Sequence, residues 1–277
     1  MTAPPGQTVS PADAVFTVTA PTGAPGPFVF ASPHSGTALP EDMRADPALS
    51  AARINGATDA MMDQMAAPGP ALGAPLIAAR LSRAYVDLNR APDALDPQLI
   101  EGLESAAGPQ AAAGYGVIHR LTGDGAALYR RRLTLQEAQG RVARMHAPYH
   151  AALAQLMRAA QAAHGRAVLI DWHSMPGHAG GAQVVLGDRH GTSCEPALTR
   201  RLRGLFEREG LTVALNRPYA GGWSTQTWGR PDEGFQAIQI EISRGLYLDP
   251  LTGGPSAGHG RCRALMGRVI AALLDVG

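Results

Sequence analysis

Lysine is absent from this sequence, and all 24 of its basic residues are arginine. The absence excludes enzymes that form a Schiff base through a lysine amine. It also excludes nucleotide-binding proteins that need the lysine of a phosphate-binding loop. Most of the arginines are interpreted as ordinary surface charge, although a buried arginine would suit bidentate binding of a carboxylate.

Cysteine is scarce, and long apolar runs are missing. The two cysteines, Cys194 and Cys262, provide neither a disulfide framework nor a cysteine-based zinc site. No apolar run approaches ~20 residues, so no membrane span is expected. No basic segment followed by an apolar core marks a signal peptide. We therefore expect a protein of a reducing compartment, the cytoplasm.

Charge of either sign is also in short supply. Charged residues make up 17% of the chain and hydrophobic residues 45%, and the formal net charge is +1. This composition can build a sizeable core, but it gives no electrostatic footprint for nucleic acid or an anionic membrane. We see no internal repeat and no second core, so we expect a tail over 1–26 and one domain over 27–277.

Segments typical of strands and helices alternate along the chain, which predicts an α/β fold. We expect a mixed, mostly parallel sheet with helices on both faces. Long loops at 91–114 and 217–234 are more typical of binding than of connection. The expected strands are 14–18, 27–32, one or two within 76–89, 115–121, 167–172, 182–186, 211–216 and 236–243. The expected helices are 41–67 in pieces, 135–163 with a bend or restart at Pro148, 195–209 and 256–276.

Two of these strands end in histidine. His34 follows the apolar run 27–32, and His173 follows the run 167–170, each with a serine directly after it and a proline close by. In open α/β sheets, ligands bind at the carboxyl ends of the strands. Two histidines delivered there could begin a metal site, and the alternative for each is a buried histidine satisfied by protein contacts.

A catalytic zinc site usually has three protein ligands and one position open to water. The candidates for the third ligand are Asp59, Asp63, Asp171 and His178. Asp171 lies two residues before His173 and would share its face of the strand, so we prefer it as the partner that fixes the imidazole. The other histidines are interpreted as helix-face, loop or surface residues: His119, His146, His150, His164, His178, His190 and His259.

Glu241 lies on the apolar strand 236–243. A carboxylate in such surroundings must be paired, desolvated or close to a cation. It could form a salt bridge with Arg244, or it could be a general base beside a metal-bound water, whose pKa zinc lowers to ~7.

The segment 82–90 alternates polar and apolar residues, as a half-buried strand does. Its polar positions include Arg83, Asn89 and Arg90. An Asn-Arg pair at a strand end can hold a substrate carboxylate. Alternatively, Arg90 forms a surface ion pair with Asp87 or Asp93.

Taken together, seven motifs in this order resemble the N-formylglutamate amidohydrolase family. They are Pro-His-Ser-Gly (33–36), Thr-Asp (58–59), Ser-Arg-x-Tyr-Val-Asp-Leu-Asn-Arg (82–90), Asp-x-His-Ser-Met-Pro (171–176), Leu-Gly-Asp-Arg-x-Gly (186–191), Asn-x-Pro-Tyr-Ala-Gly-Gly (216–222) and Gln-x-Glu-Ile-x-Arg-x-Leu-Tyr (239–247). The resemblance implies a fold like that of zinc carboxypeptidases and aspartoacylases (phosphorylase/hydrolase-like), with one zinc per chain.

The resemblance also implies roles for individual residues. His34 and His173 match zinc ligands, and Glu241 matches the catalytic glutamate. Asn89 and Arg90 match a pair that holds a substrate carboxylate, with Arg244 as a further candidate, and Arg83 could polarise the scissile carbonyl. The carboxypeptidase pattern has a glutamate three residues after its first histidine, and Thr37 stands there in this chain. We therefore expect Asp59 to be the third ligand.

The resulting hypothesis is a zinc-dependent amidohydrolase of histidine degradation, which hydrolyses a small acidic N-acyl amino acid. N-formyl-L-glutamate is the leading substrate, and formate and glutamate would be the products. Manganese, iron or cobalt could occupy the same ligands. The alternatives are a carboxypeptidase-like or other acyl-amino-acid hydrolase and a zinc-stabilised binding protein without turnover. A serine hydrolase using Ser35 or Ser174 is disfavoured, because neither serine lies in a Gly-x-Ser-x-Gly motif.

Overall fold

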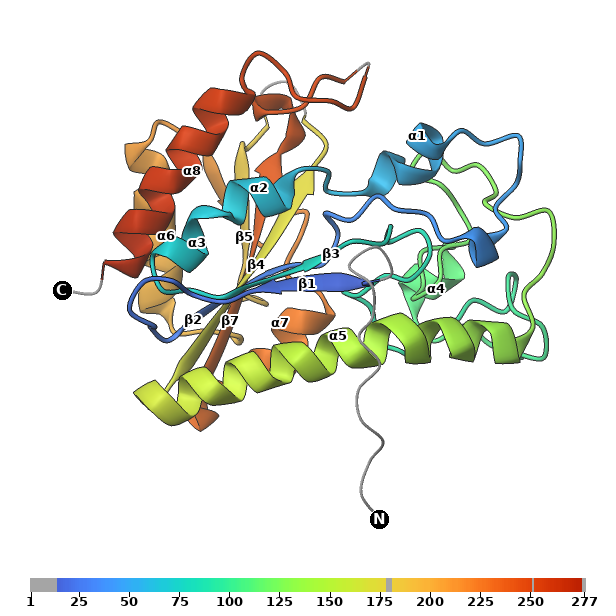
Figure 1. The fold of residues 1–277 in the computed structure, drawn as a ribbon, viewed down its shortest axis with the longest axis horizontal. Helices are drawn as coiled ribbons and strands as arrows, with labels where there is room; N and C mark the ends of the chain where they lie inside the picture. Colours follow the sequence, from blue (N-terminus) through green and yellow to red (C-terminus); the bar gives the residue numbers. More distant parts are fainter. Residues whose placement is uncertain (1–13, 178–180, 251, 276–277) are drawn as a thin grey trace.

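A seven-stranded sheet forms the centre of the protein in the computed structural model, which describes residues 14–177, 181–250 and 252–275 (Figure 1). The strand order is β1-β3-β2-β4-β7-β5-β6. The pairs β1–β3 and β5–β7 are antiparallel and the other four are parallel, which confirms the mixed, mostly parallel sheet. The strands are β1 (Phe16–Thr19), β2 (Phe28–Ser32), β3 (Leu76–Ala79), β4 (Ala167–Met175), β5 (Val184–Gly187), β6 (Val213–Leu215) and β7 (Phe235–Ser243).

The two long strands β4 and β7 lie side by side in the middle of the sheet. Every residue of β4, and every residue of β7 after Phe235, is buried. Their parallel register places His173 beside Glu241. Strands covered on both faces are nearly continuously apolar, so the polar residues that interrupt them stand out as candidates for function.

Helices cover both faces of the sheet (Figure 1). One core contains Phe30, Trp172 and Ile240, and the other contains Val29, Leu169 and Tyr149. The helices that pack on the first are α2 (Met62–Ala66), α3 (Pro68–Ala71), α6 (Pro196–Arg208) and α8 (His259–Leu274). The second is covered by α5 (Leu135–His164), α7 (Trp223–Trp228) and the irregular chain that includes α1 (Ala51–Ile54) and α4 (Pro109–Ala112).

Four segments differ from expectation. Residues 82–90 form no strand, because turns closed by Tyr85 N–H to Ser82 O and Arg90 N–H to Asp87 O fold them toward the site. Residues 115–121 contain isolated bridges only. Helix α5 runs through Pro148 as one helix, so the helix does not restart there. The expected loop 217–234 contains α7. In contrast to these four segments, the short N-terminal strand is present as expected, at Phe16–Thr19, where β1 pairs with β3.

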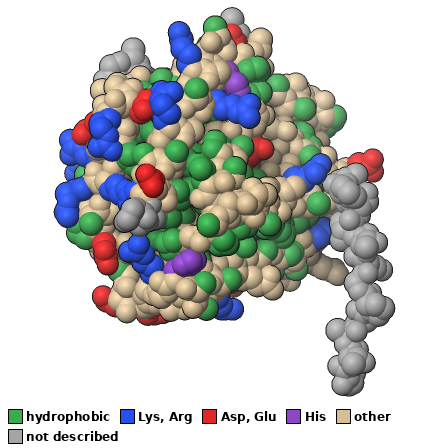
Figure 2. Space-filling view, turned by 60° about the vertical axis from the view of Figure 1, so that its left-hand side comes forward, with side chains coloured by type: hydrophobic (Ala, Val, Ile, Leu, Met, Phe, Trp, Pro, Cys, Tyr) green, Lys and Arg blue, Asp and Glu red, His purple; other side chains and the backbone are tan. Residues whose placement is uncertain are grey.

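The outer surface mixes charges of both signs. On the face drawn in Figure 2, basic and acidic side chains are interspersed around a largely uncharged middle, in keeping with the net charge of +1. Among the described residues, none of the helices is both long and apolar enough to cross a bilayer.

Candidate active site

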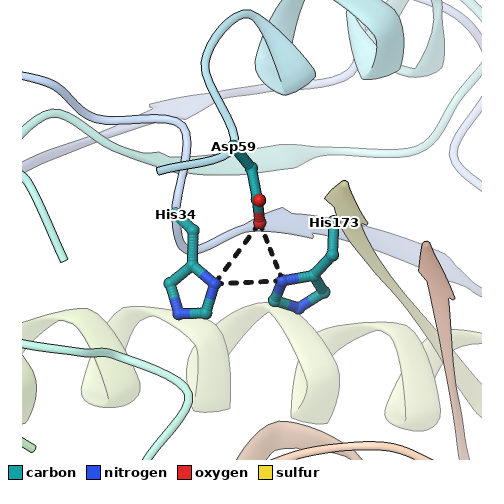
Figure 3. A group of neighbouring side chains, drawn as sticks. All are labelled: His34, Asp59 and His173. Carbon is teal, nitrogen blue, oxygen red and sulfur yellow. Dashed lines mark hydrogen bonds and ion pairs between the residues drawn. The ribbon is translucent and has the colours of Figure 1, made fainter. Parts of the chain in front are cut away.

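Three side chains from distant parts of the sequence converge at the carboxyl ends of β2 and β4 (Figure 3). His34 lies two residues beyond β2, and His173 lies near the end of β4. Asp59 follows the 3-10 turn Asn55–Ala57, and its N–H donates to the carbonyl oxygen of His34 over 2.8 Å. This backbone bond ties the Thr58-Asp59 segment to the loop that carries His34.

The ligand-type atoms of this group face one another. Asp59 Oδ2 lies 3.1 Å from His173 Nδ1 and 3.4 Å from His34 Nδ1, and the two Nδ1 atoms are 3.1 Å apart. All three residues are buried. Tetrahedral bonds of the length that zinc forms to nitrogen would separate neighbouring ligand atoms by about 3.3 Å. The donor set therefore fits a metal ion.

The outward nitrogen of each imidazole is held by a second carboxylate. His34 Nε2 donates to Asp87 Oδ1 over 2.7 Å, and His173 Nε2 donates to Asp171 Oδ2 over 3.0 Å. In metalloproteins, such bonds fix the ring orientation and leave the other nitrogen as the ligand. Asp171 therefore contacts its histidine in the way that its position in the strand suggested.

Asp87 contacts four different groups. Its Oδ2 accepts from the Arg83 guanidinium, at 2.6 Å from Nη2, and from His119 Nε2 over 3.0 Å. Its Oδ1 also accepts from the backbone N–H of Asn89. Burial opposes ionisation of this carboxyl, but Arg83 and His34 hold its pKa well below the ordinary range. His119, which was expected on a helix face, in a loop or at the surface, lies in a loop and is buried against the site.

The other oxygen of Asp59 is bonded on the far side of the group. Asp59 Oδ1 accepts from Ser174 Oγ over 2.9 Å and from Arg244 Nη2 over 3.1 Å. Burial alone would raise the pKa of Asp59, yet His173 and His34 lower it well below the ordinary value. Burial likewise opposes protonation of His173, yet Asp171, Asp59 and Glu241 raise its pKa well above the ordinary value.

Glu241 borders the same space from β7. Glu241 is 5% exposed as a residue, and its Oε1 accepts from Gln239 Nε2 over 2.7 Å. Burial is the main cause that raises the pKa of Glu241 to about 7, and the charge of Asp59 adds to it, whereas His173, Arg83 and Gln239 act in the opposite direction. A carboxyl group poised near neutrality is suited to general acid-base catalysis.

A cavity of about 690 Å³ opens onto these groups. Its walls include Glu241, Arg83 and Arg90, together with Tyr115 and Tyr219. A second cavity of about 1170 Å³ adjoins it and shares Arg244 in its wall. The first cavity can thus bring a small substrate into contact with the three ligand-type atoms and Glu241.

Asn89 and Arg90 lie at this cavity in different ways. The Asn89 side chain is buried: Nδ2 donates to Asp171 Oδ2 and Gln239 Oε1, while Oδ1 accepts from the Ser224 N–H. A side chain at Gly222 would collide with it, since an added Cβ would lie 2.5 Å from Asn89 Nδ2. Arg90 is partly exposed, and its Nε donates to the Tyr115 carbonyl.

The remaining candidates for the third ligand lie elsewhere. Asp63 is half-buried on α2 and outside the group, and burial raises its pKa. Thr37 is exposed. His178 lies outside the described residues.

Four contributors to the site were missed from the sequence: Asp87, His119, Ser174 and Gln239. The alternation of strand 236–243 places Gln239 on the same face as Glu241, and this signal could have identified it. Asp87 lies inside the 82–90 motif, but its apparent strand pattern concealed a turn. His119 lies in a loop, where periodicity gives no direction.

Known proteins are similar to this chain over most of its length. The sequence model of the N-formylglutamate amidohydrolase family matches residues 26–248. An N-formylglutamate deformylase of Pseudomonas aeruginosa is 30% identical over 237 residues, which cover 80% of this chain and 82% of the relative. One from Pseudomonas putida is 28% identical with the same coverage. The crystal structure of N-formylglutamate amidohydrolase from Ralstonia eutropha JMP134 has a TM-score of 0.89 and 34% identity, covering 95% of this chain and 98% of that one.

Proposed function

The chain belongs to the N-formylglutamate amidohydrolase family, a family of amide hydrolases, and we propose that its substrate is N-formyl-L-glutamate, which it hydrolyses to formate and L-glutamate. One observation carries the proposal. His34 Nδ1, His173 Nδ1 and Asp59 Oδ2 point at a common centre in a cavity that also contains Glu241. We also propose that the protein removes this formyl group in histidine degradation and that it acts in the cytoplasm.

We assign one zinc ion to His34, Asp59 and His173. Two imidazoles and a carboxylate are a ligand set that catalytic zinc uses, with a further position left for water or substrate. When bound, the ion would supply a Lewis acid that polarises the amide carbonyl and lowers the pKa of water. Asp87 and Asp171 would keep both Nδ1 atoms directed at it.

Glu241 is the proposed general base and general acid. Its Oε1 is held by Gln239, which fixes the plane of the carboxylate and leaves Oε2 for proton transfer. Glu241 takes a proton from the attacking water and later returns it to the nitrogen of the leaving amine. Burial supports this role, because it raises the pKa of Glu241 toward neutrality.

Arg83 is assigned to the scissile carbonyl. It borders the cavity, and Asp87 holds its guanidinium through Nε and Nη2. Burial would lower the pKa of Arg83, but the negative charges of Asp87, Asp59 and Glu241 raise it, so the side chain stays cationic. A fixed positive charge there would stabilise the negative charge that develops on the carbonyl oxygen.

Two further arginines can meet the carboxylates of the substrate. Arg90 and Arg244 both border the cavity, and a guanidinium binds a carboxylate through two hydrogen bonds. Asn89 would contribute indirectly, because its amide is occupied by Asp171 and Gln239. Holding the substrate at its carboxylates would orient its amide toward Glu241.

The experiment is metal analysis of the purified protein combined with formate release from N-formyl-glutamate, N-formyl-glutamine and N-formyl-leucine. N-acetyl-glutamate, N-succinyl-glutamate and a dipeptide test longer acyl groups. We expect about one zinc per chain and the highest kcat/KM for N-formyl-glutamate. Faster cleavage of the dipeptide or a longer acyl group would support a carboxypeptidase-like or other acyl hydrolase instead. Bound zinc without turnover of any substrate would indicate a binding protein.

A further inference from the structure

Helix α5 presents two histidines to the backbone that carries Asn89 and Arg90. His146 and His150 are one helical turn apart, and their ring centroids are 4.2 Å apart. His146 Nε2 donates to the carbonyl oxygen of Arg90 over 2.9 Å, and His150 Nε2 donates to that of Leu88 over 2.8 Å. A carbonyl only accepts, so in both rings the Nε2 atom bears the hydrogen.

The two carbonyl groups belong to the residues before and after Asn89, and the Asn89 side chain connects this segment to the groups around His173 and Glu241. Through its side chain, Asn89 contacts Asp171, the partner of His173, and Gln239, the partner of Glu241. The Leu88 carbonyl belongs to the peptide directly before Asn89, and the Arg90 carbonyl belongs to the peptide directly after Arg90. Holding these two peptides restrains the backbone of residues 88–90 and, through the Asn89 side chain, the groups that orient a ligand-type histidine and the acid-base carboxylate.

Arg90 depends on the same attachment. His146 holds its carbonyl oxygen, while the Tyr115 carbonyl accepts from its Nε. Residues 88–90 lie in no strand or helix, so no regular ladder of backbone bonds holds them. Helix α5, which packs against β2 and β4, provides the rigid support that a loop lacks.

We propose that His146 and His150 are positioning residues of the hydrolase: His146 sets the placement of the Arg90 guanidinium, and His150 sets that of the Asn89 amide. The expected changes in KM and kcat rest on the proposed function. The expected displacement of the Arg90 and Asn89 side chains does not. His146 acts on substrate binding through Arg90. His150 acts on the chemical step through Asn89, Asp171 and Gln239.

The test exploits the reach of the donor. In a His→Gln variant the amide nitrogen can occupy the position of Nε2, whereas in a His→Asn variant the donor is one bond shorter and falls short of the carbonyl. His146 and His150 are each replaced by Gln and by Asn. His164, exposed at the end of the same helix, is replaced by Asn as the matched control.

The first readout is the Nε–H resonance of Arg90 in the ¹⁵N spectrum, assigned by its loss in Arg90→Ala. We expect His146→Asn to shift or broaden it, and His146→Gln and His164→Asn to leave it near its wild-type position. An unchanged resonance in a folded His146→Asn would overturn the assignment. Should that variant not fold, His150→Asn provides the same test through the side-chain amide resonance of Asn89.

The second readout is the division between KM and kcat for N-formyl-glutamate. We expect His146→Asn to raise KM about tenfold with little change in kcat, since misplaced binding groups have effects of this size or larger. His150→Asn should lower kcat about tenfold, as loss of an outer-shell contact does. Rescue by Gln separates positioning from a general loss of stability, which would reduce the active fraction without this division.

The two readouts separate this inference from the proposed function. If the wild type releases no formate while His146→Asn shifts the Arg90 resonance, the substrate proposal fails and the positioning role stands. If the wild type is active and both Asn variants match it in kinetics and spectra, the positioning role fails and the substrate proposal stands.

Discussion

Two buried polar groups in this protein differ in the partners of their charged and polar atoms. Around Arg141, the positive charge is matched within the chain: Nη1 donates to Tyr129 Oη, and Nη2 donates to Glu137 and to the carbonyls of Asp42 and Met43. The Tyr85 ring lies 4.8 Å below the guanidinium. At the His34, Asp59 and His173 group, by contrast, three acceptor-type atoms face the same point.

The difference separates a cluster that stabilises the fold from the group that we propose as a metal site. A buried charge whose partners come from the protein fixes packing, and removing one partner is strongly destabilising. A buried set of acceptors that point at one another is favourable only with a cation or a proton among them. Burial and charge alone therefore do not identify a site; the direction of the lone pairs does.

Removing one residue from the His34, Asp59 and His173 group should abolish metal binding and hydrolysis, whereas removing Arg141 should lower stability and leave both intact. We expect His173→Ala to lose nearly all bound metal and hydrolysis, because it removes one of the three ligand-type atoms. Arg141→Met should keep metal and kcat but lower the free energy of unfolding by about 3 kcal/mol, because carbonyl and hydroxyl partners lose their donor. Metal analysis and urea denaturation measure both quantities. Full metal occupancy in His173→Ala would contradict the distinction.

The second largest effect should come from Glu241→Gln, which keeps the size of the side chain and removes its basicity. We expect kcat to fall by about 10²- to 10⁴-fold, with bound metal unchanged because Glu241 is not a member of the ligand group. Formate release and metal content measured on the same preparation separate chemistry from metal loss. A variant within a few-fold of wild type would remove Glu241 from the mechanism.

A smaller effect is expected for Asp87→Asn, which weakens the support behind His34. The amide still reaches His34 Nε2, but the negative charge is lost, so metal affinity should fall by roughly 10- to 100-fold. Competition with a calibrated chelator measures the affinity. Asp96→Asn, which weakens a buried ion pair with Arg120 away from the ligand group, is the control. Equal affinities in both variants would show that charge behind the imidazole is unimportant.

The last expected effect is absent at neutral pH and is a pH dependence of stability. Burial first, and then the charge of His146, lowers the pKa of His150 to about 4, whereas an unfolded histidine titrates near 6.5. Between these values the unfolded chain binds more protons, so stability falls as the pH falls from about 6.5 to about 4, by less than about 1.4 kcal/mol per pH unit. His150→Gln removes this contribution. Denaturation at several pH values should show a shallower dependence in the variant, and identical slopes would refute the prediction.

The meeting of His34, His173 and Glu241 was predictable from the sequence. Each lies in or just after an apolar strand, and the carboxyl ends of parallel strands share one edge of the sheet. Strands β2, β4 and β7 are neighbours in the order required. These residues came from regular structure, in which periodicity gives both position and direction.

The supporting contacts could not be predicted in the same way. Asp59 and Asp87 occupy turns, and their directions depend on tertiary bonds such as that between Asp59 N–H and the His34 carbonyl. The alternation over 82–90 resembles a strand, but the polar side chains there bond to one another and to the site. The hydrogen bonds from His146 and His150 to the backbone of residues 88–90 require α5 to lie beside this segment. No local sequence pattern predicts such a long-range contact.

The most direct test of the central claim is a crystal structure with anomalous data collected on both sides of the zinc absorption edge. We expect one anomalous peak about 2.0–2.2 Å from His34 Nδ1, His173 Nδ1 and Asp59 Oδ2. A zinc-loaded crystal with its peak at other residues, or with either Nδ1 turned away from the metal, would contradict it.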